Sequence, residues 1–148
     1  MIELKVFRID RTNPLPRTMT EGASGIDLYA SLKEPVVLEQ GEYRCIPTGL
    51  IVSLPSGYEA QIRPRSGLAA LHGVTVLNAP GTVDSDYRGE IQVILINHGP
   101  QPFTIKGGMR IAQLVVSRVE MLTIIELSSR EEAGFTDRNA GGFGHTGV

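Results

Sequence analysis

Residues 78–90 read Asn-Ala-Pro-Gly-Thr-Val-Asp-Ser-Asp-Tyr-Arg-Gly-Glu, and this polar stretch lies between two apolar runs, Val74–Leu77 and Ile91–Ile96. Two β-prone runs separated by Pro, Gly and Asp predict a hairpin with a long connecting loop. A connection that only reverses the chain needs a short turn. This loop carries Asp84, Asp86, a Tyr and an Arg, so it is expected to hold chemistry. A solvated charged turn explains the loop alone equally well.

The length and composition describe an ordinary globular chain. One domain is expected for 148 residues. The net charge of −2 argues against a general affinity for nucleic acid. The single cysteine, Cys45, excludes an intrachain disulfide, and its apolar neighbours predict a core position. Neither a signal peptide nor a membrane-spanning run is recognisable, so we expect a cytoplasmic protein without membrane partners.

The rest of the chain predicts many short strands and one short helix. Ser66–Gly73 is the helix candidate, with Ser66 as its N-cap and a glycine at its end. Further strands are expected at Ile2–Ile9, Ser24–Ala30, Pro35–Glu39, Tyr43–Leu54 with a break at Pro47, Tyr58–Arg63, Phe103–Ile105, Arg110–Val116 and Val119–Leu127. This pattern is typical of an all-β sandwich or barrel.

The C-terminal tail has a different character from the body. Apolar content falls after residue 127, so residues 1–127 are expected to form the body and 128–148 a mobile tail. Four glycines surround Phe143 in the segment 141–147. A tail that closes over a flat ligand would use such a ring for stacking, whereas a packing anchor on the body or on a neighbouring subunit is the alternative.

Several polar residues are candidates for a site. Arg65-Ser66-Gly67 stands at the start of the predicted helix, where backbone N–H groups and a guanidinium suit phosphate, although an ordinary Ser cap beside a surface Arg is the commoner arrangement. Asp27 and the pair Asp84/Asp86 offer a divalent-cation site or a general base. Asp27 alternatively ends a strand with its carboxylate satisfied by backbone N–H groups.

The remaining polar candidates lie in the last predicted strand and in the tail. Arg110 and Gln113 are three apart in a strand, which predicts opposite faces. Arg138 in the tail is a cation with reach, or a solvated charge. Zinc-type spacing of Cys and His and the P-loop pattern are both missing from the sequence.

Five segments, in order, resemble the five motifs of the trimeric dUTPase family. They are residues 23–30, 64–69, 81–90, 108–114 and 138–147. The resemblance spans essentially the whole chain, 1–148, as a single domain. It implies a jelly-roll-like β-barrel that assembles as a homotrimer, with three active sites at subunit interfaces.

The activity that this resemblance implies is hydrolysis of dUTP to dUMP and pyrophosphate with Mg²⁺. Such an enzyme limits uracil in DNA and supplies dUMP for dTMP synthesis. By similarity, Asp84 orients and deprotonates the water that attacks the α-phosphorus. Asp27 supports the magnesium indirectly, through water, while the metal lies mainly on the substrate phosphates.

The resemblance also implies the substrate contacts. They are Arg65, Ser66, Gly67 and Gln113 for the phosphates, Asn78 and Gly81 for uracil, Tyr87 for the deoxyribose, Arg138 for the γ-phosphate, and Phe143 with Gly144 in the closing tail. The chain departs from the family pattern at Ile26, Asn139 and His145, where the family usually has Tyr, Gly and Ser. Two alternatives are a dCTP deaminase of the same fold and a non-catalytic nucleotide sensor.

Overall fold

The computed structural model describes residues 2–142 and consists mainly of short strands. The strands are β1 Lys5–Arg8, β2 Ile26–Tyr29, β3 Val36–Leu38, β4 Tyr43–Pro47, β5 Leu50–Ser53, β6 Tyr58–Arg63, β7 Val74–Val76, β8 Gly81–Val83, β9 Gln92–Asn97, β10 Phe103–Ile105 and β11 Arg110–Arg118. One α-helix, α1 (Ser66–His72), and one 3₁₀ turn, η1 (Glu131–Ala133), complete the described chain. The predicted all-β class with one short helix is confirmed.

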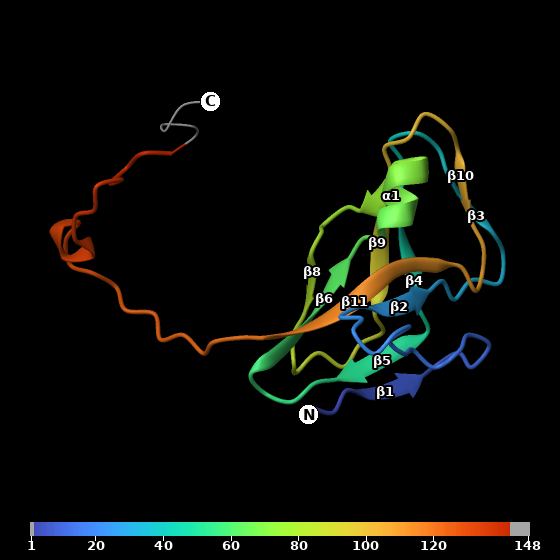
Figure 1. Cartoon of the computed structure of the whole chain (residues 1–148), viewed down its shortest axis with the longest axis horizontal. Helices are drawn as coiled ribbons and strands as arrows, with labels where there is room; N and C mark the ends of the chain where they lie inside the picture. Colours follow the sequence, from blue (N-terminus) through green and yellow to red (C-terminus); the bar gives the residue numbers. More distant parts are fainter. Residues whose placement is uncertain (1, 143–148) are drawn as a thin grey trace.

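The strands pair antiparallel in four sheets, which wrap around a common core (Figure 1). A four-stranded sheet has the order β2-β11-β6-β8, and a three-stranded sheet has the order β4-β9-β7. Two further pairs are β1-β5 and β10-β3. Within residues 2–142 these ladders stay separate and do not join into one closed ring. No helix of that range is long and apolar enough to cross a membrane.

The predicted hairpin is present, and its long loop joins two sheets. Strand β7 pairs with β9, so Val74 lies opposite Asn97. Between them the chain makes a third strand, β8, which leaves this sheet and pairs with β6, with Val83 opposite Ala60. The segment after β8 is therefore held between the two largest sheets, because its flanking strands belong to different ladders.

The core is made of the inward side chains of the two large sheets and of the two strand pairs. Among them are Leu28, Leu38, Ile46, Val93, Leu95, Ile105, Ile111 and Leu114, each 2% exposed or less. Burying one such side chain contributes about 1.5–3 kcal/mol. Asn97 is fully buried with every polar atom paired, since its Nδ2 donates to the carbonyls of Leu38 and Gln101 and its Oδ1 accepts from Gly99 N–H.

The start of α1 differs from the prediction by one residue. Arg65, not Ser66, is the N-cap, with extended φ and ψ of −94° and 127°, and its side chain makes no capping hydrogen bond. A guanidinium has no acceptor to offer a helix N-terminus, and this one is turned toward Asp27 instead. The helix ends as predicted at Gly73, which has a φ of 67° and donates to Ala69 O.

Two further predictions are wrong. Cys45 is exposed, because Ile46 occupies the inward position at this end of β4 and the alternation of the strand turns Cys45 outward. Val119–Leu127 forms no strand, although its sequence is apolar. From residue 119 to residue 142 the chain pairs with no other strand, and Ile124 is 94% exposed. Residues 119–142, here called the arm, extend away from the body (Figure 1).

Candidate active site

One carboxylate at the end of β2 pairs with two arginines. Asp27 Oδ1 lies 3.1 Å from Arg65 Nε, and its Oδ2 lies 3.2 Å from Arg110 Nη1. The Asp27 side chain is 13% exposed, while those of Arg65 and Arg110 are 27% and 44% exposed. Two guanidinium groups on one carboxylate leave a net positive charge at a surface that anions can reach. This cluster therefore suits phosphate groups.

A β-bulge in β11 brings Arg110 and Gln113 to the same side of the sheet. The pairing with β2 shifts register between Arg110 and Ala112, so that Gln113 lies opposite Asp27. Ile111 and Ala112 are consecutive and both buried, which breaks the strict alternation of a strand. The expectation that Arg110 and Gln113 occupy opposite faces is thus wrong, because the bulge adds one residue between them.

The neighbours of Gln113 complete this end of the sheet. Its Nε2 donates to Pro64 O at 2.9 Å, in the segment that leads into α1. A Cβ on Gly25 would lie 2.1 Å from Gln113 Oε1, so only glycine leaves room for this amide. Ser66 and Gly67 are exposed in the first turn of α1. The phosphate-binding residues that the sequence predicted therefore gather with Asp27 where β2, β11 and α1 meet.

The second half of the site is the loop of residues 84–90, which begins directly after β8. Asp84 is exposed, and its carbonyl accepts a hydrogen bond from Tyr87 N–H at 3.2 Å. A cavity of about 320 Å³ opens beside it, lined by Cys45, Thr82, Val83, Asp84, Tyr87, Glu90, Ile91, Gln92 and Ile94. Asp84 lines this cavity and Asp86 does not, so the two aspartates of the sequence pattern have different surroundings.

The ring of Tyr87 is fixed from several sides, although it is 45% exposed. Its Oη donates to Glu90 O at 3.1 Å. A Cβ on Gly89 would lie 2.2 Å from this oxygen, so glycine is required for the ring to lie there. Arg88 Nη1 donates to the carbonyls of Ser85 and Tyr87 at 2.7 and 2.8 Å. The loop is therefore a braced unit that contributes the side chains of Asp84, Tyr87 and Glu90 to the lining of the cavity.

Asn78 and Gly81 lie at the other end of the hairpin connection. Asn78 is exposed before β8, and Gly81 is buried within it. A Cβ on Gly81 would lie 3.2 Å from Asn78 Nδ2 and 3.4 Å from Ile62 Cβ. Because Gly81 has no side chain, the Asn78 amide lies close to the backbone of β8.

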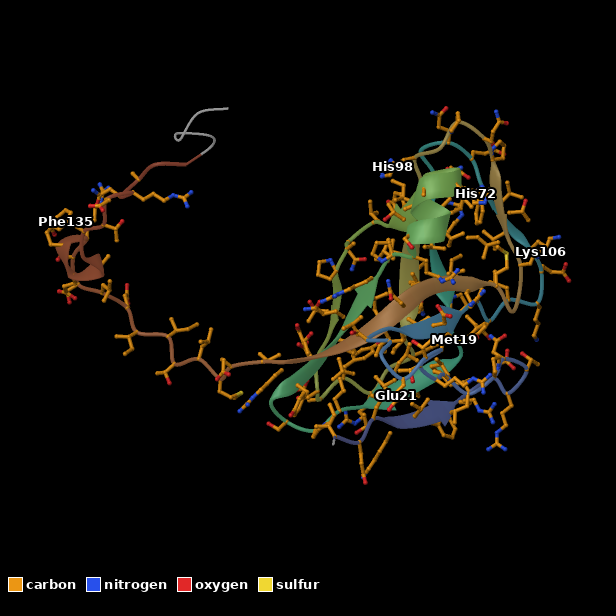
Figure 2. All side chains as sticks on the ribbon, in the orientation of Figure 1. Met19, Glu21, His72, His98, Lys106 and Phe135 are labelled. Carbon is orange, nitrogen blue, oxygen red and sulfur yellow. The ribbon has the colours of Figure 1, made fainter. Side chains whose placement is uncertain are left out.

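The described part of the tail lies apart from both halves of the site (Figure 1). Arg138 is on the arm, where its Nε donates to Gly141 O at 2.8 Å. Figure 2 shows Phe135 of the arm far from the body, which carries His72 and Lys106. Phe143 and Gly144, with His145, lie outside the described residues. The fold of one chain therefore brings Asp27, Arg65 and Gln113 together but leaves Arg138 remote from them.

Comparison with known proteins identifies the family. The sequence pattern of the dUTPase family matches residues 11–147. The chain belongs to the dUTPase family. Two relatives carry the name deoxyuridine 5'-triphosphate nucleotidohydrolase. The protein of Caldanaerobacter subterraneus subsp. tengcongensis is 57% identical over 97% of this chain and 98% of its own length. That of Thermoanaerobacter sp. strain X514 is 52% identical, over 99% of each.

Solved structures agree on the fold. The dUTPase of Staphylococcus bacteriophage 80alpha, determined with dUpNHpp, has a TM-score of 0.86 and 24% identity over 99% of both chains. A mutant dUTPase of phage phi11 of S. aureus, described for its coordination of a structural Mg(II) ion, has a TM-score of 0.77 and 21% identity over 87% of this chain and 99% of that one. At this identity the likeness shows the dUTPase fold alone.

The carboxylates of this dUTPase family member can bind magnesium only together with phosphate groups of a bound nucleotide. Within residues 2–142 no group of three or more His, Cys, Asp or Glu side chains is placed to hold a metal ion. Asp27 is paired with two arginines. Magnesium usually keeps several waters and binds through one or two carboxylates together with substrate phosphates. The donor set is therefore compatible with an ion that is carried mainly by phosphates.

Sequence reasoning missed one partner of Asp27 and several residues that line the cavity of this candidate site. Arg110 was not assigned to the cluster at Asp27, because the bulge that turns it there depends on pairing with β2. Cys45 and Gln92 line the cavity beside Asp84, and Cys45 Sγ donates to Gln92 Oε1. The sequence held no clear signal for the outward position of Cys45, because residues 43–45 of β4 are all exposed and do not alternate with buried ones.

Proposed function

We propose that this chain hydrolyses dUTP to dUMP and pyrophosphate, and so limits uracil in DNA and supplies dUMP for dTMP synthesis. The observation that carries the proposal is the braced loop that presents Asp84 and Tyr87 to one cavity. The names of the relatives at 57% and 52% identity support it. A cytoplasmic location stays a prediction from the sequence.

Asp84 is the general base in this proposal. Its exposed carboxylate takes a proton from a water molecule as the water oxygen forms a bond to the α-phosphorus. The bond from the α-phosphorus to the bridging oxygen breaks, and pyrophosphate leaves with the electron pair. The fixed backbone of the loop matters because a general base must lie within hydrogen-bond reach of the proton that it removes.

The cluster at Asp27 holds the phosphates. Arg65 and Arg110 are the cations, and Ser66, Gly67 and Gln113 add neutral donors beside them. Phosphate oxygens compete with Asp27 for the guanidinium groups, so their arrival frees its carboxylate to hold water. Mg²⁺, when bound to the phosphates, neutralises their charge and favours an in-line geometry.

The hairpin connection reads the nucleoside. Asn78 and the backbone at Gly81 pair with the polar edge of uracil, while the Tyr87 ring packs on the deoxyribose and leaves no space for a 2′-hydroxyl. Cytosine exchanges an acceptor for a donor at its exocyclic position, which leaves buried polar atoms unpaired at a cost of about 1–3 kcal/mol each. The same pocket rejects thymine by overlap with its methyl group.

A homotrimer with sites at its subunit interfaces explains why the arm exposes apolar side chains in the single chain. Met121, Leu122, Ile124 and Ile125 are 76–94% exposed in the single chain, and such a run of apolar side chains is normally covered. Packing the arm on a neighbouring copy buries them. It also carries Arg138 toward the γ-phosphate of a neighbour's substrate, and Phe143 and Gly144 toward its uracil.

Pyrophosphate release with Mg²⁺ tests the function directly. We expect rapid release from dUTP, and slow release from UTP and dCTP. Asp84→Asn should lower kcat about 10²–10⁴-fold, the usual contribution of a general base, while nucleotide binding persists. Equal turnover of UTP, ammonia release from dCTP, or tight dUTP binding without hydrolysis by the wild-type protein would each refute the proposal.

A further inference from the structure

Glu90 closes the loop of residues 84–90 and makes a contact that the chemistry above does not use. Its Oε1 accepts a hydrogen bond from Gly49 N–H at 2.7 Å. The carboxylate is half-buried and lines the cavity beside Asp84 and Tyr87. Hydrogen bonds from backbone N–H groups to an ionised carboxylate are shorter and stronger than neutral ones. This bond therefore ties the loop to the turn between β4 and β5.

The turn at Gly49 is itself held rigidly. Gly49 has a φ of 69°, and its carbonyl accepts from Ile9 N–H at 2.8 Å and from Asp10 N–H at 3.4 Å. A Cβ at this position would lie 3.0 Å from Asp10 Cβ and 3.1 Å from Ser31 Oγ. Asp10 and Ser31 are joined in turn by a hydrogen bond of 2.7 Å. The donor that Glu90 uses is thus a fixed point of the body.

The other hydrogen bonds of residues 84–90 found in the described structure stay inside the loop. They join Tyr87 N–H to Asp84 O, Arg88 to the carbonyls of Ser85 and Tyr87, and Tyr87 Oη to Glu90 O. These bonds give the loop its shape but do not fix that shape relative to the cavity. Glu90 links the loop to the body, because its side chain accepts a hydrogen bond from Gly49 N–H while its carbonyl accepts one from the Tyr87 hydroxyl.

We propose that Glu90 is a positioning residue for the reaction: its bond to Gly49 N–H holds the Tyr87 ring in the pose that admits a deoxynucleotide. The proposal rests on the function proposed above and deepens it. Loss of the bond leaves Ile91 paired with Thr48 and Leu50 of the same turn, but it frees the segment before Ile91, which carries Tyr87, to shift relative to the cavity. This shift weakens the discrimination between deoxyribose and ribose, since Tyr87 is the residue that excludes the 2′-hydroxyl in the proposed function.

Three variants of the full-length protein separate this role from general stability. Glu90→Ala removes the acceptor, and Glu90→Gln keeps an amide oxygen that accepts from Gly49 N–H. Glu42→Ala is the matched control, because Glu42 also accepts a backbone N–H, that of Glu39, but lies outside the loop. The measurements are kcat and KM for dUTP and for UTP with Mg²⁺, together with the thermal midpoint of each variant.

We expect Glu90→Ala to lower kcat/KM for dUTP about tenfold, the order of one lost hydrogen bond to a charged acceptor. Its kcat/KM for UTP should fall less, so that discrimination between the two sugars shrinks. Glu90→Gln should restore most of both properties, and Glu42→Ala should match the wild type. If Glu90→Ala fails to fold, the partial loss in Glu90→Gln still reports on discrimination.

The opposite results overturn the proposal. Unchanged kinetics in Glu90→Ala would overturn it, and so would equal losses of kcat/KM for dUTP and UTP. A Glu90→Gln variant that rescues neither property would also overturn it. If the alanine variant does not fold, unchanged discrimination between dUTP and UTP in Glu90→Gln overturns it instead. A wild-type protein that does not hydrolyse dUTP refutes the proposed function instead, and the wild-type assay is run first for this reason.

Discussion

At the scale of single residues, Asp10 shows how a half-buried carboxylate at the surface becomes structural. The hydroxyl of Ser31 donates to it, and the backbone N–H and hydroxyl of Thr12 donate as well. These hydrogen bonds, that from Ser31 first, hold the pKa of Asp10 below its ordinary value of 3.8. A lowered folded-state pKa means that the ionised form stabilises the fold above pH 3.8, and that this contribution disappears as the pH falls through the folded pKa.

We therefore expect Asp10→Asn to lower the thermal midpoint at pH 7, since its amide replaces a charged acceptor by a neutral one. The difference from the wild type should narrow as the pH is lowered below 3.8, because Asp10 then becomes neutral in the wild type. Thermal unfolding followed between pH 2.5 and 7 measures both. Glu3→Gln is a control for loss of one exposed negative charge. A midpoint difference that does not change with pH would contradict the assignment.

Arg110 is a second residue whose role depends on the fold. If it binds phosphate beside Arg65, Arg110→Ala should raise KM for dUTP about tenfold, because one charge-assisted contact is lost. Arg63→Ala is the matched control, since that exposed guanidinium bonds only to Gln61 among the described residues. Steady-state kinetics distinguishes the two, and equal KM values for both variants would exclude Arg110 from the phosphate site.

The sequence was sufficient for the residue types of the site but not for their partners. Asp84, Tyr87 and Gly81 stand in a recognisable pattern, because turn formation and β-propensity depend on residues that are adjacent in the sequence. The pairing of Arg110 with Asp27 could not be predicted, since they are 83 positions apart and meet only through a bulge in the β2-β11 ladder. Cys45 was misplaced because apolar neighbours do not reveal which face of a strand is covered.

At the scale of elements, the same limit separates what was predicted from what was not. Most strands that pair within the chain were predicted from alternation or from apolar runs, and α1 from its glycine stop, whereas β8 was expected to be part of the loop. Val119–Leu127 has the composition of a strand, yet a strand needs a ladder, and within this chain that partner does not exist among the described residues. Local pattern therefore predicts that a segment can pair, while the rest of the fold decides whether it does.

The glycine that ends α1 gives a prediction at this scale. Gly73 has a φ of 67°, and a Cβ there would lie 2.6 Å from Gly99 N and 2.8 Å from Gly99 Cα. Gly73→Ala should therefore lower the free energy of unfolding by about 3 kcal/mol or more, from strain and overlap together. Gly57 has a φ of 82° with no atom within 4 Å of a Cβ, so Gly57→Ala should cost only about 1–2 kcal/mol.

Chemical denaturation of the two glycine variants tests this difference. The Gly57 variant isolates the cost of the left-handed backbone, so the excess in the Gly73 variant reports the contact between the end of α1 and the turn after β9. Equal losses in both variants would mean that the Gly99 backbone moves aside at little cost.

At the scale of the whole molecule, one part of the proposed site is on the body and another part is on the arm. Asp84 is on the body, whereas Arg138 is on a segment that leaves it (Figure 1). A tail that acted on its own chain would have to fold back. A tail that acts on a neighbour needs only the extended course that the chain already takes, and packing of residues 119–127 covers their apolar side chains.

Complementation between two inactive chains distinguishes these arrangements. One chain carries Asp84→Asn with an intact tail, and the other lacks residues 134–148 but keeps Asp84 and the apolar part of the arm. Each alone should be inactive. If tails act in trans within a trimer, co-refolding equal amounts should restore about a quarter of the sites, because each site then draws Asp84 and its tail from different chains at random.

The control is the same pair of chains mixed after folding, without exchange of subunits, which should stay inactive. If each tail serves the Asp84 of its own chain, no combination of the two defects yields an intact site, and co-refolding restores nothing. Recovery of dUTP hydrolysis thus requires both a shared site and an exchanged arm. Failure to recover, with mixed oligomers demonstrated by mass, would show that the arm folds back, and the exposed apolar run would then need a different cover.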